Sequence, residues 1–169
     1  MKLIILTGAP ASGKSSIALE LSRKTGIKSV SKDDCKIALF EKYGFSSHAR
    51  KKQLSIFGEK ILSRLIKCCV DGDKDLIVDN NFKNFDDVKA LLLRSNCDLY
   101  CVVCSADAEI LAERYNNRIK KLERHPALYT LNQYPIIDGV SMFHHWIDKD
   151  DVCRIQQNVT EPTFGNRVL

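Results

Sequence analysis

Short apolar runs alternate with amphipathic stretches along the whole chain. Four runs are too brief for helices, and we predict strands at residues 3–6, 27–31, 75–79 and 99–104. Apolar positions recur at helical spacing elsewhere, which predicts helices at residues 14–26, 33–43, 46–70, 84–95, 107–123 and 136–147. This alternation favours an α/β fold with a largely parallel sheet.

The helical pattern is clearest in residues 46–70 and weakest near the C-terminus. We expect one apolar stripe of the long helix to face the core: Leu54, Phe57, Ile61, Leu62, Leu65 and Ile66. The basic residues at 50–52, Arg-Lys-Lys, indicate a solvated face or, as the weaker alternative, a patch for a polyanion. After residue 149 the pattern allows an edge strand at residues 152–159, and we expect a loop from residue 162 onward.

The segment between the first strand and the first helix carries the most specific motif. Residues 8–15, Gly-Ala-Pro-Ala-Ser-Gly-Lys-Ser, match G-x-x-x-x-G-K-[ST] at every fixed position. Gly8 and Gly13 let the backbone turn tightly and bring N–H groups near phosphate oxygens. A chance match in an ordinary strand–helix turn is the alternative, and the complete motif in its expected context disfavours it.

This phosphate loop, residues 8–16, defines the expected ATP site. We expect Lys14 to reach the β- and γ-phosphates and the Ser15 hydroxyl to ligate Mg²⁺. Further phosphate contacts are expected from the other residues of the loop: Gly8, Ala11, Ser12, Gly13 and Ser16. The sequence therefore predicts ATP and Mg²⁺ as cofactors.

Carboxylates follow two of the predicted strands, and the carboxyl ends of parallel strands face one crevice. Asp33, after the second strand, is our candidate general base toward an attacking hydroxyl. Alternatively, Asp33 or Asp34 caps the following helix, and each acid can take one of the two roles. Asp79, at the end of the third strand, is our candidate support for Mg²⁺, and a turn at Asp79-Asn80-Asn81 is the alternative.

Arg114 and Arg118 lie four residues apart on one predicted helix, so they share a face. Two guanidinium groups on one face can hold phosphates and neutralise charge during phosphoryl transfer. A solvated basic helix, paired with Glu109 and Glu113, is the alternative that spacing alone favours.

Several signatures of other protein classes are missing from the chain. There is no Asn-Lys-x-Asp guanine motif, and no Asp-x-x-Gly follows the strand that ends at Asp79. A phosphoryl-transfer enzyme therefore fits better than a regulatory GTPase. Cys97, Cys101 and Cys104 have the spacing of iron–sulfur radical enzymes, but strand side chains point alternately to opposite faces, so we predict core cysteines.

Composition adds a modest preference for anionic ligands, since the 169 residues carry a net charge of +5 and a pI near 8.8. The length predicts a single domain over residues 1–169, with the role of residues 150–169 open. No apolar run approaches the length of a membrane span, and the first residues do not resemble a signal peptide. Seven scattered cysteines favour a reduced, cytoplasmic setting.

Taken together, these residues resemble the kinase domain of polynucleotide 5′-hydroxyl kinases, within the group that includes zeta-toxin-like and chloramphenicol phosphotransferase-like enzymes. Besides the phosphate loop, residues 31–36, Ser-Lys-Asp-Asp-Cys-Lys, look like the family's Arg-Asp-Asp-x-x-Arg segment. This likeness implies that Asp33 is the base and that Lys36 binds the phosphate of the acceptor. Residues 114–118, Arg-Tyr-Asn-Asn-Arg, look like the family's lid, in which paired arginines hold the donor phosphates.

The resemblance covers about residues 2–147 and departs from the family on the acceptor side. Asp79-Asn80-Asn81 is similar to the family's Asp-x-Thr-Asn strand end, which implies acceptor contacts for Asn80 and Asn81. However, Asn81-Phe82 stands where Thr-Asn is expected. Lys36 also offers a point charge where the family has a bidentate Arg.

The resemblance implies a P-loop NTPase three-layer sandwich of the adenylate-kinase-like kind, with a parallel sheet and a helical lid. It implies transfer of the ATP γ-phosphoryl group to a 5′-hydroxyl of RNA or DNA, with release of ADP and no membrane partner. An alcohol of a sugar, nucleotide sugar or antibiotic is the alternative acceptor. A nucleotide-binding regulatory protein without turnover is the alternative of another class.

Overall fold

The computed structural model describes residues 1–44, 46–80, 86–93, 95–121, 124–128, 146–157 and 167–168. Their strands form one sheet in the order β2-β3-β1-β4-β5, and every neighbouring pair is parallel. The strands are β1 (Lys2–Gly8), β2 (Ser29–Ser31), β3 (Leu76–Asp79), β4 (Asp98–Cys104) and β5 (Arg167–Val168). The predicted parallel α/β fold is confirmed, and the strand that leads into the phosphate loop lies in the middle of the sheet.

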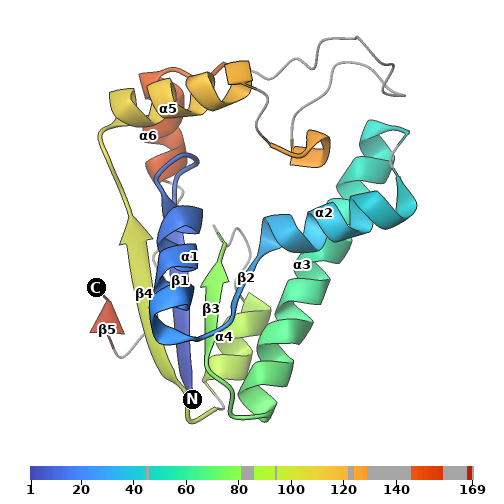
Figure 1. Ribbon diagram of the computed structural model, residues 1–169, viewed down its shortest axis with the longest axis vertical. Helices are drawn as coiled ribbons and strands as arrows, with labels where there is room; N and C mark the ends of the chain where they lie inside the picture. The colour runs from blue at the N-terminus through green and yellow to red at the C-terminus, as the bar shows by residue number, and fades with distance from the viewer. Residues whose placement is uncertain are drawn as a thin grey trace.

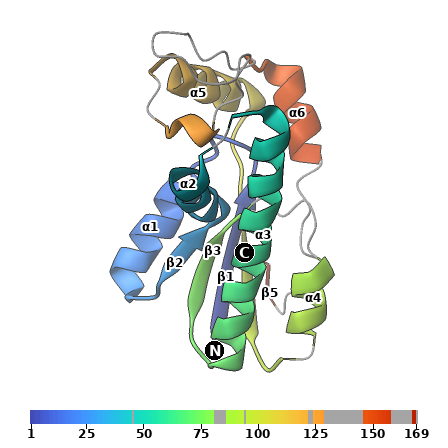
Figure 2. The same ribbon diagram turned by 90° about the vertical axis from the view of Figure 1, so that its right-hand side faces the viewer.

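Helices cover both faces of the sheet (Figures 1 and 2). Leu6 and Ile77 pack with Ala18 of α1 on one face, whereas Leu3 packs with Leu62 of α3 on the other. The helical elements are α1 (Lys14–Thr25), α2 (Lys32–Tyr43), α3 (His48–Asp71), α4 (Asp86–Leu92), α5 (Ala108–Lys121), the short 3₁₀ helix η1 (Pro126–Leu128) and α6 (Lys149–Gln157). The predicted three-layer arrangement is confirmed.

Local capping signals fix where the helices near the phosphate loop begin and end. α1 lies between two capping glycines, Gly13 before its first residue and Gly26 after its last, and both glycines have left-handed backbone conformations. α2 begins with a capping box, in which the Ser31 hydroxyl accepts from the Asp34 N–H and the Asp34 carboxylate accepts from the Ser31 N–H. Asp34 therefore takes the capping role considered for one of the two neighbouring acids.

The apolar stripe predicted for α3 is only partly buried. Leu54, Leu62 and Ile66 belong to the core, and Gly58 continues their row against α2. Three other members of the predicted stripe are solvent-exposed, namely Phe57 (56% exposed), Ile61 (36%) and Leu65 (41%). The prediction is wrong for these three because α3 packs through a single row of residues four apart, and each of the three comes one residue before a member of that row, about 100° away around the helix.

The strand predicted at residues 152–159 is also wrong, because this segment begins within α6. Val152 is buried, and Ile155, three residues later, joins it against Leu111 of α5, which is a helical spacing. The Asp148 and Asp151 side chains each accept a hydrogen bond from the other residue's N–H, at 2.8 and 3.2 Å, and so cap the helix. An edge strand does occur in the tail, but it is β5, within the segment predicted as a loop.

The remaining predicted boundaries agree to within a few residues where the structure describes them. Asn81 and most of the helix predicted at residues 136–147 lie outside the described residues. Cys101 and Cys104 are buried in β4, as predicted for core cysteines, and all seven cysteines are free thiols. Among the described helices, none is both long enough and apolar enough to cross a membrane.

Candidate active site

The phosphate loop connects β1 to α1 and packs beside the end of β4. Gly8 and Gly13 have φ angles of +142° and +92°, and Ala11 between them has a φ angle of +64°. A Cβ atom on Gly8 would lie 2.1 Å from the carbonyl oxygen of Cys104, whereas a Cβ atom on Gly13 would meet nothing within 4 Å. Gly8 is therefore required by both space and backbone conformation, and Gly13 by conformation alone.

Lys14 is the first residue of α1, and its ammonium group folds back over the loop. The Nζ atom donates hydrogen bonds of 2.8 Å to the carbonyl oxygens of Gly8 and Ala9. Burial lowers the pKa of Lys14, and the neighbouring Asp79 carboxylate partly opposes this effect. The positive charge is thus held at the loop, within reach of an anion bound there.

Ser15 and Asp79 join α1 to the end of β3. Ser15 Oγ donates a 2.5 Å hydrogen bond to Oδ2 of Asp79, which is 7% exposed. Burial raises the pKa of Asp79, although the Ser15 hydrogen bond and the Lys14 charge act in the opposite direction. A hydroxyl and a single carboxylate, completed by substrate phosphates and water, are ligands that suit Mg²⁺. The residues present therefore fit the ion that the sequence analysis expects.

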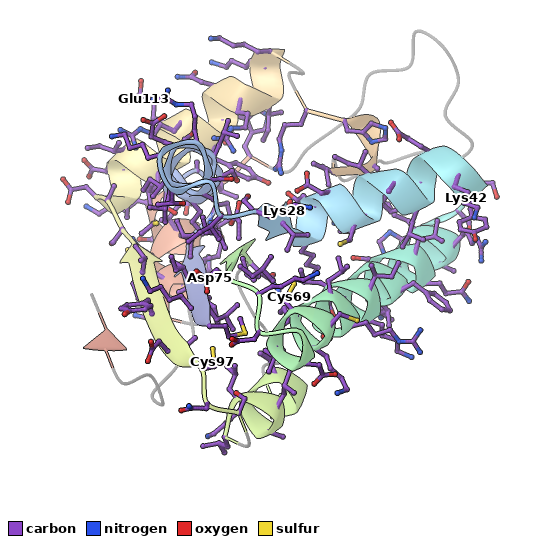
Figure 3. All side chains as sticks on the ribbon, turned by 60° about the horizontal axis from the view of Figure 1, so that its bottom comes forward. Lys28, Lys42, Cys69, Asp75, Cys97 and Glu113 are labelled. Carbon is purple, nitrogen blue, oxygen red and sulfur yellow. The ribbon has the colours of Figure 1, made fainter. Side chains whose placement is uncertain are left out.

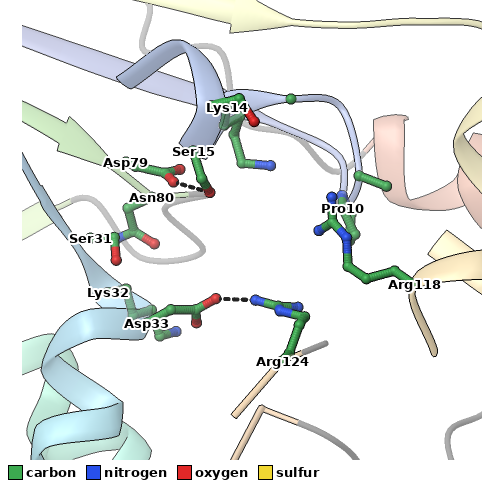
Figure 4. Close-up of a pocket in the computed structure, with 13 residues that line it drawn as sticks. Pro10, Lys14, Ser15, Ser31, Lys32, Asp33, Asp79, Asn80, Arg118 and Arg124 are labelled. Carbon is green, nitrogen blue, oxygen red and sulfur yellow. Dashed lines mark hydrogen bonds and ion pairs between the residues drawn. The ribbon is translucent and has the colours of Figure 1, made fainter. Parts of the chain in front are cut away.

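Asp33 lies in the first turn of α2 and faces the same space as the phosphate loop (Figure 4). Nη2 of Arg124 donates a 2.5 Å hydrogen bond to Oδ2 of Asp33, and Nζ of Lys36 lies 3.9 Å from Oδ1. The Asp33 side chain is 42% exposed, so a ligand can reach it. Because Asp34 caps α2, Asp33 is left available to the cavity.

One cavity of about 460 Å³ contains these groups, and its size lies within the range of small-ligand sites. Its lining comes from the phosphate loop, the start of α2, the end of β3, the last turn of α5 and Arg124 just before η1 (Figure 4). The lining residues are Pro10, Ala11, Gly13, Lys14, Ser15, Ser16, Ser31, Lys32, Asp33, Asp79, Asn80, Arg118 and Arg124.

Three residues predicted on the donor side do not line the cavity. Gly8 and Ser12 belong to the base of the loop, where Ser12 Oγ is buried without a hydrogen-bond partner among the described residues. Arg114 is exposed on α5, one turn before Arg118, which does reach the cavity. The structure therefore separates the two arginines that the sequence analysis placed together.

On the acceptor side, Lys36 lies behind Asp33 rather than in the cavity lining. Its Cγ would lie 3.0 Å from a Cβ on Gly58, so α2 and α3 approach closely at this lysine. Burial lowers the pKa of Lys36, and the Asp33 carboxylate opposes this effect. Asn80 lines the cavity at the end of β3, next to Asp79.

Arg124 is a cavity residue that the sequence analysis did not single out. It comes just before η1, whose Ala127 is fully buried with Phe40 of α2 and Leu54 of α3. This contact between distant segments brings Arg124 to Asp33. Local sequence does not encode it, since the Arg-His-Pro of residues 124–126 indicates only the end of a helical stretch.

Known proteins share this architecture. Over residues 3–131 the sequence matches the family AAA_33, described as an AAA domain. A candidate kinase from Chloroflexus aurantiacus j-10-fl superposes with a TM-score of 0.75 at 22% identity, over 99% of this chain and 85% of that one. No curated protein sequence matches significantly.

Two further solved structures carry more specific names. A gluconokinase from Sinorhizobium meliloti 1021 has a TM-score of 0.52 at 12% identity, over 99% of this chain and 80% of that one. A chain of the Pnkp1/Rnl/Hen1 RNA repair complex has a TM-score of 0.61 at 19% identity, over 94% of this chain but 43% of that longer one. Identities this low show the fold, which is that of P-loop kinases.

Proposed function

The chain belongs to the AAA_33 family, and from this membership and the cavity we propose that it is a kinase that transfers the γ-phosphoryl group of ATP to a hydroxyl. The acceptor that we propose is the 5′-hydroxyl of a polynucleotide. One observation carries the proposal: a single cavity joins the phosphate loop to Asp33. Nucleotide binding alone does not need an acid facing the loop, whereas transfer to a hydroxyl uses one as a base.

The donor is held by the loop and by four side chains. Lys14 exchanges the Gly8 and Ala9 carbonyl oxygens for oxygens of the β- and γ-phosphates. Arg118, which lines the cavity near Pro10, neutralises charge on the transferred group (Figure 4). Mg²⁺ held through Ser15 and Asp79 would supply further charge stabilisation at the phosphate oxygens.

On the acceptor side, Asp33 hydrogen-bonds the incoming hydroxyl and takes its proton. The oxygen then forms a bond to the γ-phosphorus while the bond from that phosphorus to the β–γ bridging oxygen breaks. The proton remains on Asp33, and ADP leaves with the bridging oxygen. Arg124 occupies one lone pair of the Asp33 carboxylate and places a positive charge beside it, so the departure of Arg124 favours uptake of the proton.

Two observations support a polynucleotide acceptor. Cationic residues gather around Asp33, since Arg124 and Lys36 both approach its carboxylate and Lys32 lines the cavity beside it. The fold is also shared with a chain of an RNA repair complex. The small-molecule alternative is supported by the likeness to a gluconokinase.

We further propose a reducing, cytoplasmic setting. All seven cysteines are free thiols, and one of them, Cys68, is exposed on α3. Free exposed thiols persist in compartments where thiol reductants are maintained.

The experiment that tests this function is a transfer assay with γ-labelled ATP. The full chain is incubated with Mg²⁺ and a panel of 5′-hydroxyl oligonucleotides, nucleosides and sugars, and the labelled product is identified. We expect label on the oligonucleotides, with a rate that falls steeply as salt increases, because phosphate contacts release counterions.

Each outcome of this assay has a definite meaning. Label on a sugar or a nucleoside but not on oligonucleotides would replace the proposed acceptor and retain the kinase. ATP binding without label on any acceptor would contradict the kinase and favour a nucleotide-binding regulatory protein.

A further inference from the structure

We propose that Arg124 determines acceptor specificity by binding an anionic group, a phosphate or a carboxylate, that lies next to the hydroxyl to be phosphorylated. The inference rests on the proposed kinase activity and deepens it, because it names the acceptor class as anionic alcohols. On this account Arg124 passes from Asp33 to the acceptor anion, and Asp33 is released to act as the base.

The position of Arg124 is fixed by the fold rather than by a free loop. Ala127 is fully buried with Phe40 and Leu54, and this contact anchors η1 on α2 and α3. The N–H of Ala127 donates to Nδ1 of His125 at 3.2 Å, and the N–H of Leu128 donates to the His125 carbonyl oxygen at 2.9 Å. Arg124 therefore belongs to the wall of α2 and α3 that carries Asp33.

Arg118 and Arg124 extend toward different residues of the cavity. Arg118 lies near Pro10 of the phosphate loop, whereas Arg124 extends to Asp33, with which it is paired (Figure 4). An arginine that acts on the donor phosphates would be expected beside the loop. The placement of Arg124 next to the candidate base therefore assigns it to the acceptor.

Cationic side chains lie on both oxygens of the Asp33 carboxylate. Arg124 approaches Oδ2 and Lys36 approaches Oδ1. Lys32, which also lines the cavity, is paired with Glu59 of α3. An anionic group on the acceptor would be attracted to these cations, whereas a neutral alcohol would not.

The Arg124–Asp33 pair is placed so that it can be exchanged. Both side chains are partly exposed, at 31% and 42%, and both line the cavity. A guanidinium group carries five N–H donors in a planar fork, so it can contact a carboxylate and a second anion during the exchange. A neutral alcohol offers nothing to compete for the fork, which leaves Asp33 paired and turnover low.

The test compares matched acceptors that differ only in the anion. One pair is a nucleoside and its 3′-monophosphate, which share the 5′-hydroxyl, and the other, the sugar pair, is gluconamide and gluconate, which share the open chain and all of its hydroxyls. Steady-state kinetics with Mg-ATP are measured for the full-length chain and for Arg124→Met, Arg124→Lys and Lys42→Met. Lys42 is the matched control because it is an exposed cation at the end of α2 remote from Asp33 (Figure 3).

For the unaltered chain we expect kcat/KM to be about 10- to 100-fold higher for the anionic member of a pair, the size of one charge-assisted hydrogen bond. Arg124→Met should remove this preference and leave the KM for ATP unchanged, and Arg124→Lys should restore part of it. Lys42→Met should behave as the unaltered chain. A preference within the nucleoside pair alone identifies a phosphate as the anion, and one within the sugar pair alone identifies a carboxylate.

Three results would overturn the inference. The first is equal kcat/KM for the anionic and neutral members of both pairs. The second is an Arg124→Met variant that loses activity equally on both members, which would show a structural role. Both leave the kinase itself intact. The third is label on no acceptor at all, which removes the proposed function and the inference with it.

Discussion

Replacing Asp79 by Asn should make the free protein more stable while weakening its response to Mg-ATP. The Asp79 carboxylate is 7% exposed, and burial raises its pKa, so the folded protein holds the charged form at a cost. An Asn side chain keeps an oxygen that can accept the 2.5 Å hydrogen bond from Ser15 Oγ. The charge, and with it the support for Mg²⁺, is lost.

The two effects have opposite signs and comparable sizes. Replacing a functional group that the fold holds at a cost commonly stabilises a protein by about 0.5–2 kcal/mol. In a chain of this length each kcal/mol corresponds to roughly 2–4 °C in Tm. ATP at about 100 times its Kd would protect the unaltered chain by about 2.7 kcal/mol. If weakened metal support raises the Kd by about 10- to 100-fold, this protection falls to about 1.4 kcal/mol or less.

The stability gain should depend on pH in a defined direction. Because the pKa of Asp79 is raised in the folded protein, the folded state binds more protons than the unfolded state between the ordinary value of 3.8 and the raised value. The unaltered chain therefore loses stability as pH rises through this window, and the variant does not. The advantage of the variant should be smallest near pH 4 and complete above the raised pKa.

Thermal unfolding with and without Mg-ATP measures both effects. Asp98→Asn is the control, since Asp98 is an exposed acid at the start of β4, remote from the cavity. Its stability, and the increase in stability that Mg-ATP produces, should match those of the unaltered chain to within about 0.5 kcal/mol. If Asp79→Asn is less stable at neutral pH, or keeps the full Mg-ATP shift, the assigned environment or the assigned role of Asp79 is wrong.

Three further predictions, two of them with a second substitution for comparison, test the rest of the donor site. Lys14→Ala should lower turnover by at least about 100-fold in the transfer assay, because charge stabilisation at the phosphates is lost; normal turnover would contradict the role of the lysine. Gly8→Ala should lower the free energy of unfolding by about 3 kcal/mol in a denaturant titration, since its Cβ would lie 2.1 Å from the Cys104 carbonyl oxygen. Gly13→Ala should lower it by about 1–2 kcal/mol, because only the backbone conformation opposes a side chain there. Equal losses would refute the packing argument. Arg118→Ala should lower kcat by about 1,000-fold or more. Arg114→Ala should leave kcat within about threefold of that of the unaltered chain, as for other surface substitutions. Equal losses would show that both arginines act on the donor.

The features that the sequence predicts well are those encoded locally. The phosphate loop, the capped start of α2 and the alternation of strands and helices each depend on residues close together in the chain. Once the strands are parallel, the rule that their carboxyl ends share a crevice brings Asp33 and Asp79 to the loop without further information. This is why the cavity contains both predicted acids.

The features that the sequence misses depend on packing between distant segments. Arg124 reaches Asp33 only because Ala127 is buried between α2 and α3. Arg114 and Arg118 share a face by spacing, yet they are one turn, about 6 Å, apart along the helix, so only Arg118 reaches the cavity. The α6 segment is wrongly predicted as a strand because a few apolar residues spaced among polar ones in a short segment do not distinguish the two structures. The contact of Val152 and Ile155 with Leu111 decides for a helix.

We expect Asp33 to act as the base for transfer from a nucleotide held by the phosphate loop. The most direct measurement combines ATP titration with transfer of γ-label to a 5′-hydroxyl oligonucleotide, for the unaltered chain and for Asp33→Asn. For Asp33→Asn we expect an ATP Kd unchanged within about threefold and a transfer rate lower by about 100- to 10,000-fold, the usual contribution of a general base. Undiminished transfer by Asp33→Asn would contradict this role.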